Sequence, residues 1–200
     1  LPQARGGYRL GHGKLVDGMI HDGLWDPYGD FHMGNAGDKC AAEHGFSREA
    51  QDEYARESFR RALAAQKEGL FKAEIEPVAI PQKKGDPLLV SEDEGPPSGK
   101  PEKFASLRAA FSKDGTITAA NASSINDGAS AVLLGGEGAL ETEPLARIAG
   151  RAAFGNDPDV FGVAPVEAAN RALARAGRTW DDVDLVELNE AFASQSLACL

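Results

Sequence analysis

The last third of the chain alternates predicted strands with helical patterns, and this alternation restricts the possible folds more than any other feature. Residues 146–153 are predicted as one strand and residues 183–188 as another, buried one. Between them, alanines and leucines recur along one helical face, with Pro165 at the start and Gly177 at the end, which predicts a helix. A second helix of small residues is predicted after residue 193. The order strand, helix, strand, helix predicts an α/β fold with a parallel sheet.

Two more apolar segments lie upstream of this alternation, at residues 116–120 and 129–134. The first is rich in small and β-branched side chains. The second is an apolar run, interrupted only by Ser130 and bounded by glycines at 128 and 135. Because strands buried on both faces are near-continuous apolar runs, both segments predict buried strands.

The clearest helix signals surround residues 48–68. Ser47 is a good N-cap residue, apolar side chains recur every three or four residues, and Gly69 ends the pattern. A short edge strand is predicted near residues 75–80, where prolines remove ladder hydrogen bonds. The polar, proline-rich residues 83–100 predict a surface loop.

The two ends of the chain differ from its middle. The first 34 residues hold eight of the 23 glycines, which predicts frequent turns and light packing. The chain begins at Leu1 without an initiator methionine or an apolar leader, and Leu200 falls inside the last predicted helix. Both ends are therefore expected to lie within a longer protein.

Charge and cysteine content exclude several classes of function. Lys plus Arg number 21 against 31 Asp plus Glu, a net charge of −10, and no local basic face offsets it. Neither nucleic acid nor a membrane is therefore an expected partner, and apolar runs such as residues 131–134 are far too short to cross a bilayer. Cys40 and Cys199 stand far apart without metal-ligand spacing, so we expect no disulfide framework, no metal site and a cytoplasmic location.

Three polar clusters join loops to regular elements, at residues 32–34, 121–129 and 189–193. Asn189 follows a predicted strand and precedes a helix, where its amide either holds a water or an oxyanion or caps the helix. The cluster at 121–129 is either a well-knit turn or a ligand contact. His32 is either a surface side chain or a ligand contact.

These clusters carry a resemblance to a known family. Residues 189–193 read N-E-A-F-A, and residues 116–129 read T-I-T-A-A-N-A-S-S-I-N-D-G-A. A glycine-rich stretch that begins at Gly6 is followed by His32-Met33-Gly34. In this order the motifs resemble those of the thiolase family, and most closely its biosynthetic branch, the acetyl-CoA acetyltransferases. The resemblance covers essentially all 200 residues.

The resemblance implies a thiolase fold, with layered α/β halves and an inserted loop domain, of which only the central part is present. Residues 1–115 would form the loop domain inserted in the first half, residues 116–143 the last strand region of that half, and residues 144–200 the start of the second half. Thiolases carry both catalytic cysteines and the histidine of a G-H-P motif outside the segments that match here. The 200-residue chain alone is therefore expected to be inactive.

By the same resemblance, the full-length protein is expected to be a transferase of lipid metabolism that condenses two acetyl-CoA to acetoacetyl-CoA and CoA, or catalyses the reverse thiolysis. A degradative 3-ketoacyl-CoA thiolase and a non-catalytic CoA-binding thiolase-like protein remain the alternatives. No separate cofactor is expected, because the coenzyme A thioester is itself the substrate. Residues 6–30 resemble the insertion through which biosynthetic thiolases join as tetramers, so a homo-oligomer, dimer or tetramer, is expected.

The family motif implies a catalytic role for one residue of this chain. Asn189 would hold a water that completes an oxyanion hole. Eight other residues match positions that line the coenzyme A and acyl pocket, where small or apolar side chains suit a narrow, dry slot. They are Leu24, His32, Met33, Phe111, Ala119, Ser123, Ala191 and Phe192.

Overall fold

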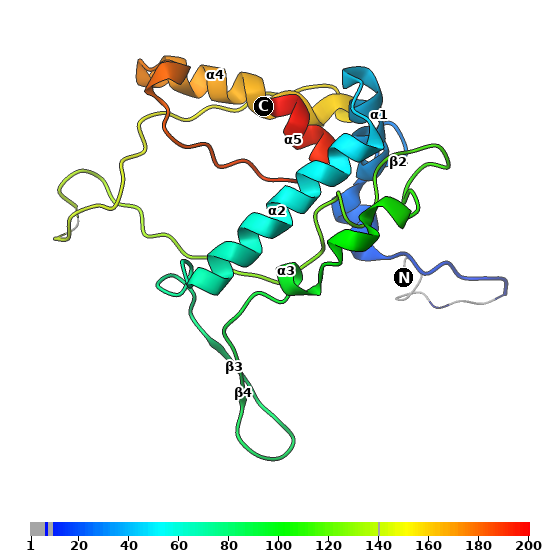
Figure 1. Cartoon of the computed structure of the whole chain (residues 1–200), viewed down its shortest axis with the longest axis horizontal. Coiled ribbons are helices and arrows are strands. Elements are labelled where there is room, and N and C mark those ends of the chain that lie inside the picture. The colour runs from blue at the N-terminus through cyan, green and yellow to red at the C-terminus, as the bar shows by residue number, and fades with distance from the viewer. Residues whose placement is uncertain (1–6, 8–9, 140) are drawn as a thin grey trace.

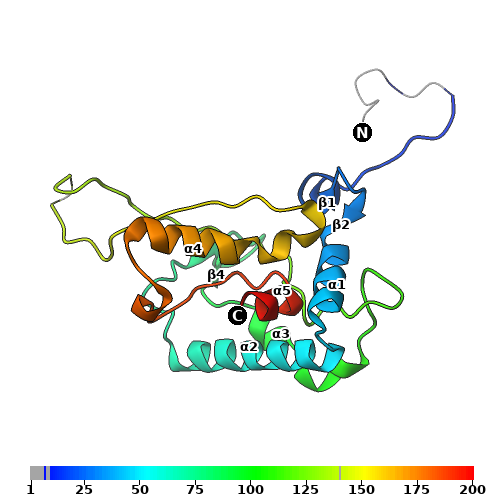
Figure 2. The ribbon, with the colours of Figure 1, turned by 90° about the horizontal axis from the view of Figure 1, so that it is seen from above.

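The computed structural model describes residues 7, 10–139 and 141–200 of the chain. Gly6, the first residue of the glycine-rich motif, lies outside the described residues. Three helices form the packed centre: α1 (Met33–His44), α2 (Arg48–Glu68) and α5 (Ala193–Cys199). α5 lies between α2 on one side and, on the other, α4 (Ala164–Ala176) with the preceding turn η3 (Pro158–Val163) (Figure 1, Figure 2).

The two long helices begin and end at the residues that the sequence predicts. The Ser47 hydroxyl accepts a hydrogen bond from the Ala50 N–H at 3.1 Å, and Gly69 closes α2 in the left-handed conformation with φ 72°. α4 has a proline in its first turn, and Gly177 ends it with φ 64°. Such glycine caps satisfy the last carbonyls of a helix without strain on a Cβ. The helices predicted at 48–68 and after Pro165 are thus confirmed.

α1 and α5 approach closely because small residues face each other across the contact. The Ser194 hydroxyl donates a hydrogen bond to the Gly37 carbonyl at 3.0 Å, and the Cys40 thiol donates to the Ser194 carbonyl at 3.7 Å. A methyl group added at Gly37 would lie only 3.1 Å from the Phe192 ring. This contact places the segment that leads into α5 directly against α1.

A small apolar cluster packs against the middle of α2. It joins Ala55 to Phe104, which lies in the turn η2 (Pro101–Ser106), and to Ala120. Phe59 packs its edge against Phe104, with ring centroids 5.4 Å apart. The cluster ties the middle of α2 to the chain around residue 120.

Two antiparallel hairpins are the only sheets among the described residues. β1 (Trp25–Asp26) pairs with β2 (Phe31–His32), and β3 (Val78–Ile80) pairs with β4 (Leu88–Val90). β3 confirms the edge strand predicted near residues 75–80. The second hairpin projects away from the helices (Figure 1), so residues 83–100 are largely exposed as predicted, although they include β4 and the short helix α3 (Gly95–Ser98).

The predicted buried strands at 116–120, 129–134, 146–153 and 183–188 do not form, and the predicted parallel sheet is wrong for the described part of the chain. A strand exists only where a neighbouring backbone accepts and donates its ladder hydrogen bonds. Residues 124–139 and 141–150 instead run as a long extended excursion (Figure 1), in which Val132 is 81% exposed.

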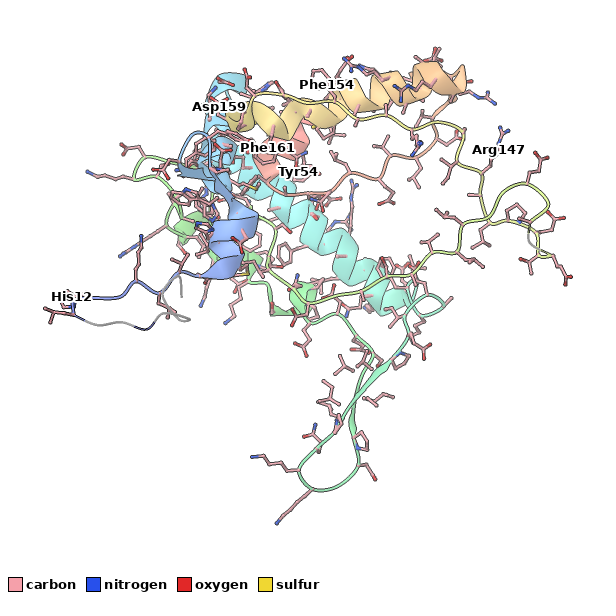
Figure 3. All side chains as sticks on the ribbon, turned by 180° about the vertical axis from the view of Figure 1, so that it is seen from behind. His12, Tyr54, Arg147, Phe154, Asp159 and Phe161 are labelled. Carbon is pink, nitrogen blue, oxygen red and sulfur yellow. The ribbon has the colours of Figure 1, made fainter. Side chains whose placement is uncertain are left out.

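The predicted strand at 146–153 packs along α4 instead of entering a sheet. A methyl group at Gly150 would overlap the carbonyl oxygen of Ala172, so only glycine permits this close approach. The Arg175 guanidinium donates to the Arg151 carbonyl at 2.7 Å. Just beyond this segment, the Phe154 ring lies 4.7 Å from the Arg171 guanidinium (Figure 3). These contacts hold the segment to one helix.

Two short turns complete the described elements: η1 (Ile20–Leu24), before β1, and η4 (Trp180–Asp182), after α4. Within the described ranges, none of the helices combines the length and the apolar character needed to cross a bilayer.

Candidate active site

Two of the three polar clusters meet in space although some 70 residues separate them. Ala122 and Phe192 form an isolated antiparallel bridge. The Ser123 N–H donates to the Ala191 carbonyl at 2.9 Å, and the Ala193 N–H donates to the Asn121 carbonyl at 2.8 Å. The bridge therefore joins the segment that contains Asn121 to the start of α5.

Asn121 is a structural residue at the centre of a buried polar network. Its Oδ1 accepts from the Thr118 N–H at 2.7 Å, and its Nδ2 donates to the Thr116 carbonyl at 3.0 Å and to Asp52 Oδ1 at 3.2 Å. The other Asp52 carboxylate oxygen accepts from Arg48 at 2.9 Å. Because Asn121 and Asp52 are almost fully buried, the turn interpretation of this cluster is supported and the Asn121 amide is not available to a ligand.

The third cluster reaches the bridge through a chain of aromatic rings. His32 stacks on Phe111 with ring centroids 4.6 Å apart, and Phe111 meets Phe192 edge-on at 6.4 Å. A methyl group at Gly34 would overlap the Phe111 ring, so glycine is required there. The three clusters that the sequence singles out thus lie together in the fold.

His32 also caps α1. Its Nδ1 accepts from the Gly34 N–H at 3.0 Å, and the Asn35 side chain accepts from the His32 N–H at 3.2 Å. Burial lowers the pKa of His32 below its usual value, and a capping Nδ1 must be unprotonated. His32 is therefore neutral at neutral pH, half-buried, and more than a surface histidine.

The other predicted pocket residues lie around this centre. Leu24 directly precedes β1, whose Trp25 pairs with His32, and Met33 is the first residue of α1. Ala191 is half-buried beside the bridge. Ala119 and the Ser123 side chain are exposed on either side of the buried Asn121. That these residues together line one pocket stays a prediction.

Asn189 is exposed and does not cap a helix. The N-cap position of α5 belongs to Phe192, three residues later, and no side chain caps that end. Within the described ranges, the Asn189 amide makes no hydrogen bond to the protein, and no strand precedes it. The helix-cap alternative is therefore wrong, and the role of Asn189 in holding a water stays a prediction.

The sequence analysis missed a contact beside Asn189. Glu190 accepts hydrogen bonds from the Tyr54 hydroxyl at 2.7 Å and from the Ser58 hydroxyl at 2.6 Å. Tyr54 lies on the side of α2 that faces the chain leading into α5 (Figure 3). The i, i+4 spacing of the two hydroxyls is a visible signal of a shared helix face, but nothing in it identifies a partner 132 residues away.

Both cysteine thiols are held by main-chain carbonyls. Burial raises the pKa of Cys40, and its thiol donates to a main-chain carbonyl. The Cys199 thiol donates to the Gly162 carbonyl at 3.4 Å. Among the described residues, no three His, Cys, Asp or Glu side chains gather closely enough to hold a metal ion.

Two surface cavities lie apart from the predicted site. One, of about 490 Å³, lies between α1 and the turn at residues 112–116. The other, of about 500 Å³, lies between the end of α2 and the chain on either side of the second hairpin. None of the predicted site residues lines either cavity.

Comparison with known proteins agrees with the order of the motifs. Residues 1–138 match the model of the thiolase N-terminal domain, and residues 142–200 match that of the thiolase C-terminal domain. The chain is 50% identical to "Acetyl-CoA acetyltransferase" of Pseudomonas aeruginosa, over 99% of this chain and 51% of that protein. It is 47% identical to "Probable acetyl-CoA acyltransferase" of Staphylococcus aureus, over 98% of this chain and 51% of that protein.

The same relation holds in three dimensions. The crystal structure of the Bacillus anthracis acetyl-CoA acetyltransferase matches with a TM-score of 0.92 and 40% identity, over 100% of this chain and 51% of that one. The chain thus spans about half the length of the relatives it matches, and the fold expected from the resemblance is confirmed over that half. On both family models and on this structural match, the chain belongs to the thiolase family.

Proposed function

We propose that the full-length protein is an acyltransferase that condenses two acetyl-CoA to acetoacetyl-CoA and CoA, or runs the reverse thiolysis. The observation that carries this proposal is the bridge between residues 121–123 and 191–193. It joins two of the three family motifs, the rings of His32, Phe111 and Phe192 connect the third, and the Asn189 side chain is exposed beside them. The 50% identity to a relative named acetyl-CoA acetyltransferase supports the choice of acyl donor.

The condensation has two bond-forming steps. An enzyme thiolate attacks the thioester carbonyl of the first acetyl-CoA, the bond to the CoA sulfur breaks, and CoA leaves. A base then takes the α-proton of the second acetyl-CoA, and the resulting carbon nucleophile attacks the acyl-enzyme and releases the thiolate. Each attack places negative charge on a carbonyl oxygen, which hydrogen-bond donors must stabilise.

The residues of this chain are proposed to supply one donor and part of the pocket. Asn189 would hold a water that donates to one of the two oxyanions. The stacked rings of His32 and Phe111, with Phe192 edge-on, would wall the slot for the pantetheine arm and the acyl group. The thiolate and the base are proposed to lie outside these 200 residues, so the chain alone would have no turnover.

The segment at residues 6–30 is proposed to join copies of the protein into a tetramer. Its side chains include exposed Leu15, Met19, Ile20 and Trp25. Exposed apolar side chains gathered on one short segment are typical of a contact surface. In the full-length protein, deletion of residues 8–22 is expected to leave dimers in sedimentation, and an unchanged tetramer would refute this role.

The proposed activity is tested by assaying acetoacetyl-CoA thiolysis and acetyl-CoA condensation with the full-length protein. We expect turnover with the four-carbon substrate and a sharp fall with longer 3-ketoacyl-CoA chains. Equal rates with long 3-ketoacyl-CoA chains would favour the degradative alternative. The Staphylococcus aureus relative named "Probable acetyl-CoA acyltransferase" is consistent with that alternative. Binding of CoA without turnover would favour the non-catalytic alternative. A place in lipid metabolism is proposed from the relative named acetyl-CoA acetyltransferase. A cytoplasmic location is proposed because the two cysteines do not have the spacing of a disulfide framework.

A further inference from the structure

The Glu190 carboxylate lies between two hydroxyls of α2. Tyr54 donates to one carboxylate oxygen at 2.7 Å, and Ser58 donates to the other at 2.6 Å. Hydroxyl-to-carboxylate hydrogen bonds of this length are charge-assisted and stronger than neutral ones. The two donors are four residues apart on one helix, so they hold both oxygens of the carboxylate from one rigid face.

The donors are themselves well supported. α2 runs over 21 residues with capped ends, and its buried residues Gln51, Asp52 and Ala55 fix it to the neighbouring chain. Burial and the Glu190 carboxylate both raise the pKa of Tyr54, so its hydroxyl remains protonated and able to donate well above neutral pH. The pair therefore presents a constant arrangement of donors to Glu190.

The backbone position of Asn189 depends on the hydrogen bonds of Glu190 to Tyr54 and Ser58 more than the positions of the other motif residues do. Its neighbours on the C-terminal side are held by main-chain bonds, at Ala191 and Ala193. On the N-terminal side, residues 183–188 form no ladder within the described ranges. Glu190 is thus the residue next to Asn189 whose side chain is fixed, and it is fixed by α2.

We infer that Tyr54 and Ser58 are positioning residues that orient the Asn189 amide through Glu190. This inference rests on the proposed function, in which Asn189 holds the oxyanion water. The hydroxyls would touch neither substrate nor water. They would act by keeping the Asn189 backbone where its amide reaches the site.

The first test measures kcat and KM of the full-length protein that carries Tyr54→Phe and Ser58→Ala together. A small misplacement of a catalytic group costs rate, so kcat is expected to fall about tenfold while KM stays within about twofold. Ser98→Ala with Ser106→Ala removes two hydroxyls from exposed positions elsewhere and is expected to leave both constants unchanged. Unchanged kcat in the first double variant would overturn the inference.

The second test adds Asn189→Ala to the Tyr54→Phe and Ser58→Ala background. If the hydroxyls act only through Asn189, they cost nothing further once its amide is gone, and the losses of kcat are not multiplicative. Fully multiplicative losses would mean that the pair acts elsewhere and would overturn the inference. Ser58→Thr, which keeps a hydroxyl, is expected to retain most of kcat.

The outcomes separate this inference from the proposed function. If Asn189→Ala leaves kcat unchanged, the proposed role of Asn189 fails, whatever the hydroxyls do. If Asn189→Ala lowers kcat and the Tyr54→Phe, Ser58→Ala variant does not, only the positioning inference fails. Should the double variant not fold, Ser58→Ala alone carries the test, with an expected fall in kcat of about threefold and an unchanged melting temperature.

Discussion

Residues 116–122 and residues 129–134 are both short runs of small and apolar side chains, but they end in opposite environments. Ile117 and Thr118 are fully buried. Val132, Leu133 and Leu134 are 81%, 78% and 70% exposed. The more hydrophobic segment is therefore the exposed one.

The difference lies in the polar groups around each segment. Asp38 Oδ1 accepts from the Thr116 N–H at 2.8 Å and from the Ile117 N–H at 3.0 Å. The Gln51 amide donates to the Thr116 hydroxyl at 3.0 Å, and Asp52 binds Asn121. Within the described ranges, no comparable set of side chains meets residues 129–134. Hydrophobic character favours burial in general, but directed hydrogen bonds from α1 and α2 select which segment is buried.

The largest effect is expected at Asn189, which is exposed next to the bridge between residues 121–123 and 191–193. Asn189→Ala in the full-length protein should lower kcat by about two to three orders of magnitude with little change in KM, because the lost donor acts mainly in the transition state. Asn170→Ala removes a different exposed amide, which accepts a hydrogen bond from Trp180, and is the matched control. Steady-state kinetics and the melting temperature are measured on the same preparations. Unchanged kcat in Asn189→Ala would remove this residue from the mechanism.

A large loss of stability is expected from the network that buries the first segment. Asp52→Ala leaves the Asn121 amide and the Arg48 guanidinium without their buried acceptor. Groups left unpaired in this way cost several kcal/mol, and we expect a loss of about 3 kcal/mol in the free energy of unfolding. Urea denaturation measures it. A loss below about 1 kcal/mol would show that other contacts, not this network, hold the segment.

A smaller, pH-dependent effect is expected at the cap of α1. Unfolded His32 takes up a proton near pH 6.5, whereas burial lowers the pKa of folded His32. The contribution of the cap is therefore complete above about pH 6.5 and is lost as the pH falls through the folded pKa. We expect about 1 kcal/mol less stability at low pH than in His32→Asn, which caps without titrating. Parallel denaturation curves of the two proteins across this range would contradict the assignment.

The smallest effect is expected in the exposed segment. Leu133→Ala, measured in the 200-residue chain, should change the free energy of unfolding by less than about 0.5 kcal/mol. The Leu133 side chain is largely exposed, so its removal costs almost no packing contacts. Destabilisation of about 2 kcal/mol or more would mean that another backbone covers residues 129–134 in solution. That result would remove the contrast between the two segments.

Local signals predict the helices well because their causes lie within a few residues. Ser47 and Gly69 bound α2, and Gly177 ends α4, each through hydrogen bonds to the adjacent turn. The order of motifs likewise identifies the family, which the matches to both thiolase domains confirm. The structure also brings the three polar clusters together, and their role in binding or catalysis stays a prediction.

Local sequence patterns do not predict the strands or the contacts between distant residues. The predicted strands at 129–134 and 183–188 depend on a partner backbone, and an apolar run does not specify one. The hydrogen bond between Ser58 and Glu190 joins residues 132 positions apart in the sequence, and neither residue type predicts it. Local pattern alone does not identify Asp52 as the partner of Asn121.

The amino-acid sequence alone predicts the family, the long helices and Asn189 as the candidate catalytic residue. It can do so because helix caps, terminal glycines and short motifs are each defined by residues close together in the sequence. Only the folded chain shows that Asn189 caps nothing, that α2 holds Glu190, and that residues 116–122 are buried while residues 129–134 are exposed. The physical reason is that burial and positioning depend on partners far along the chain, and those partners meet only when the helices pack.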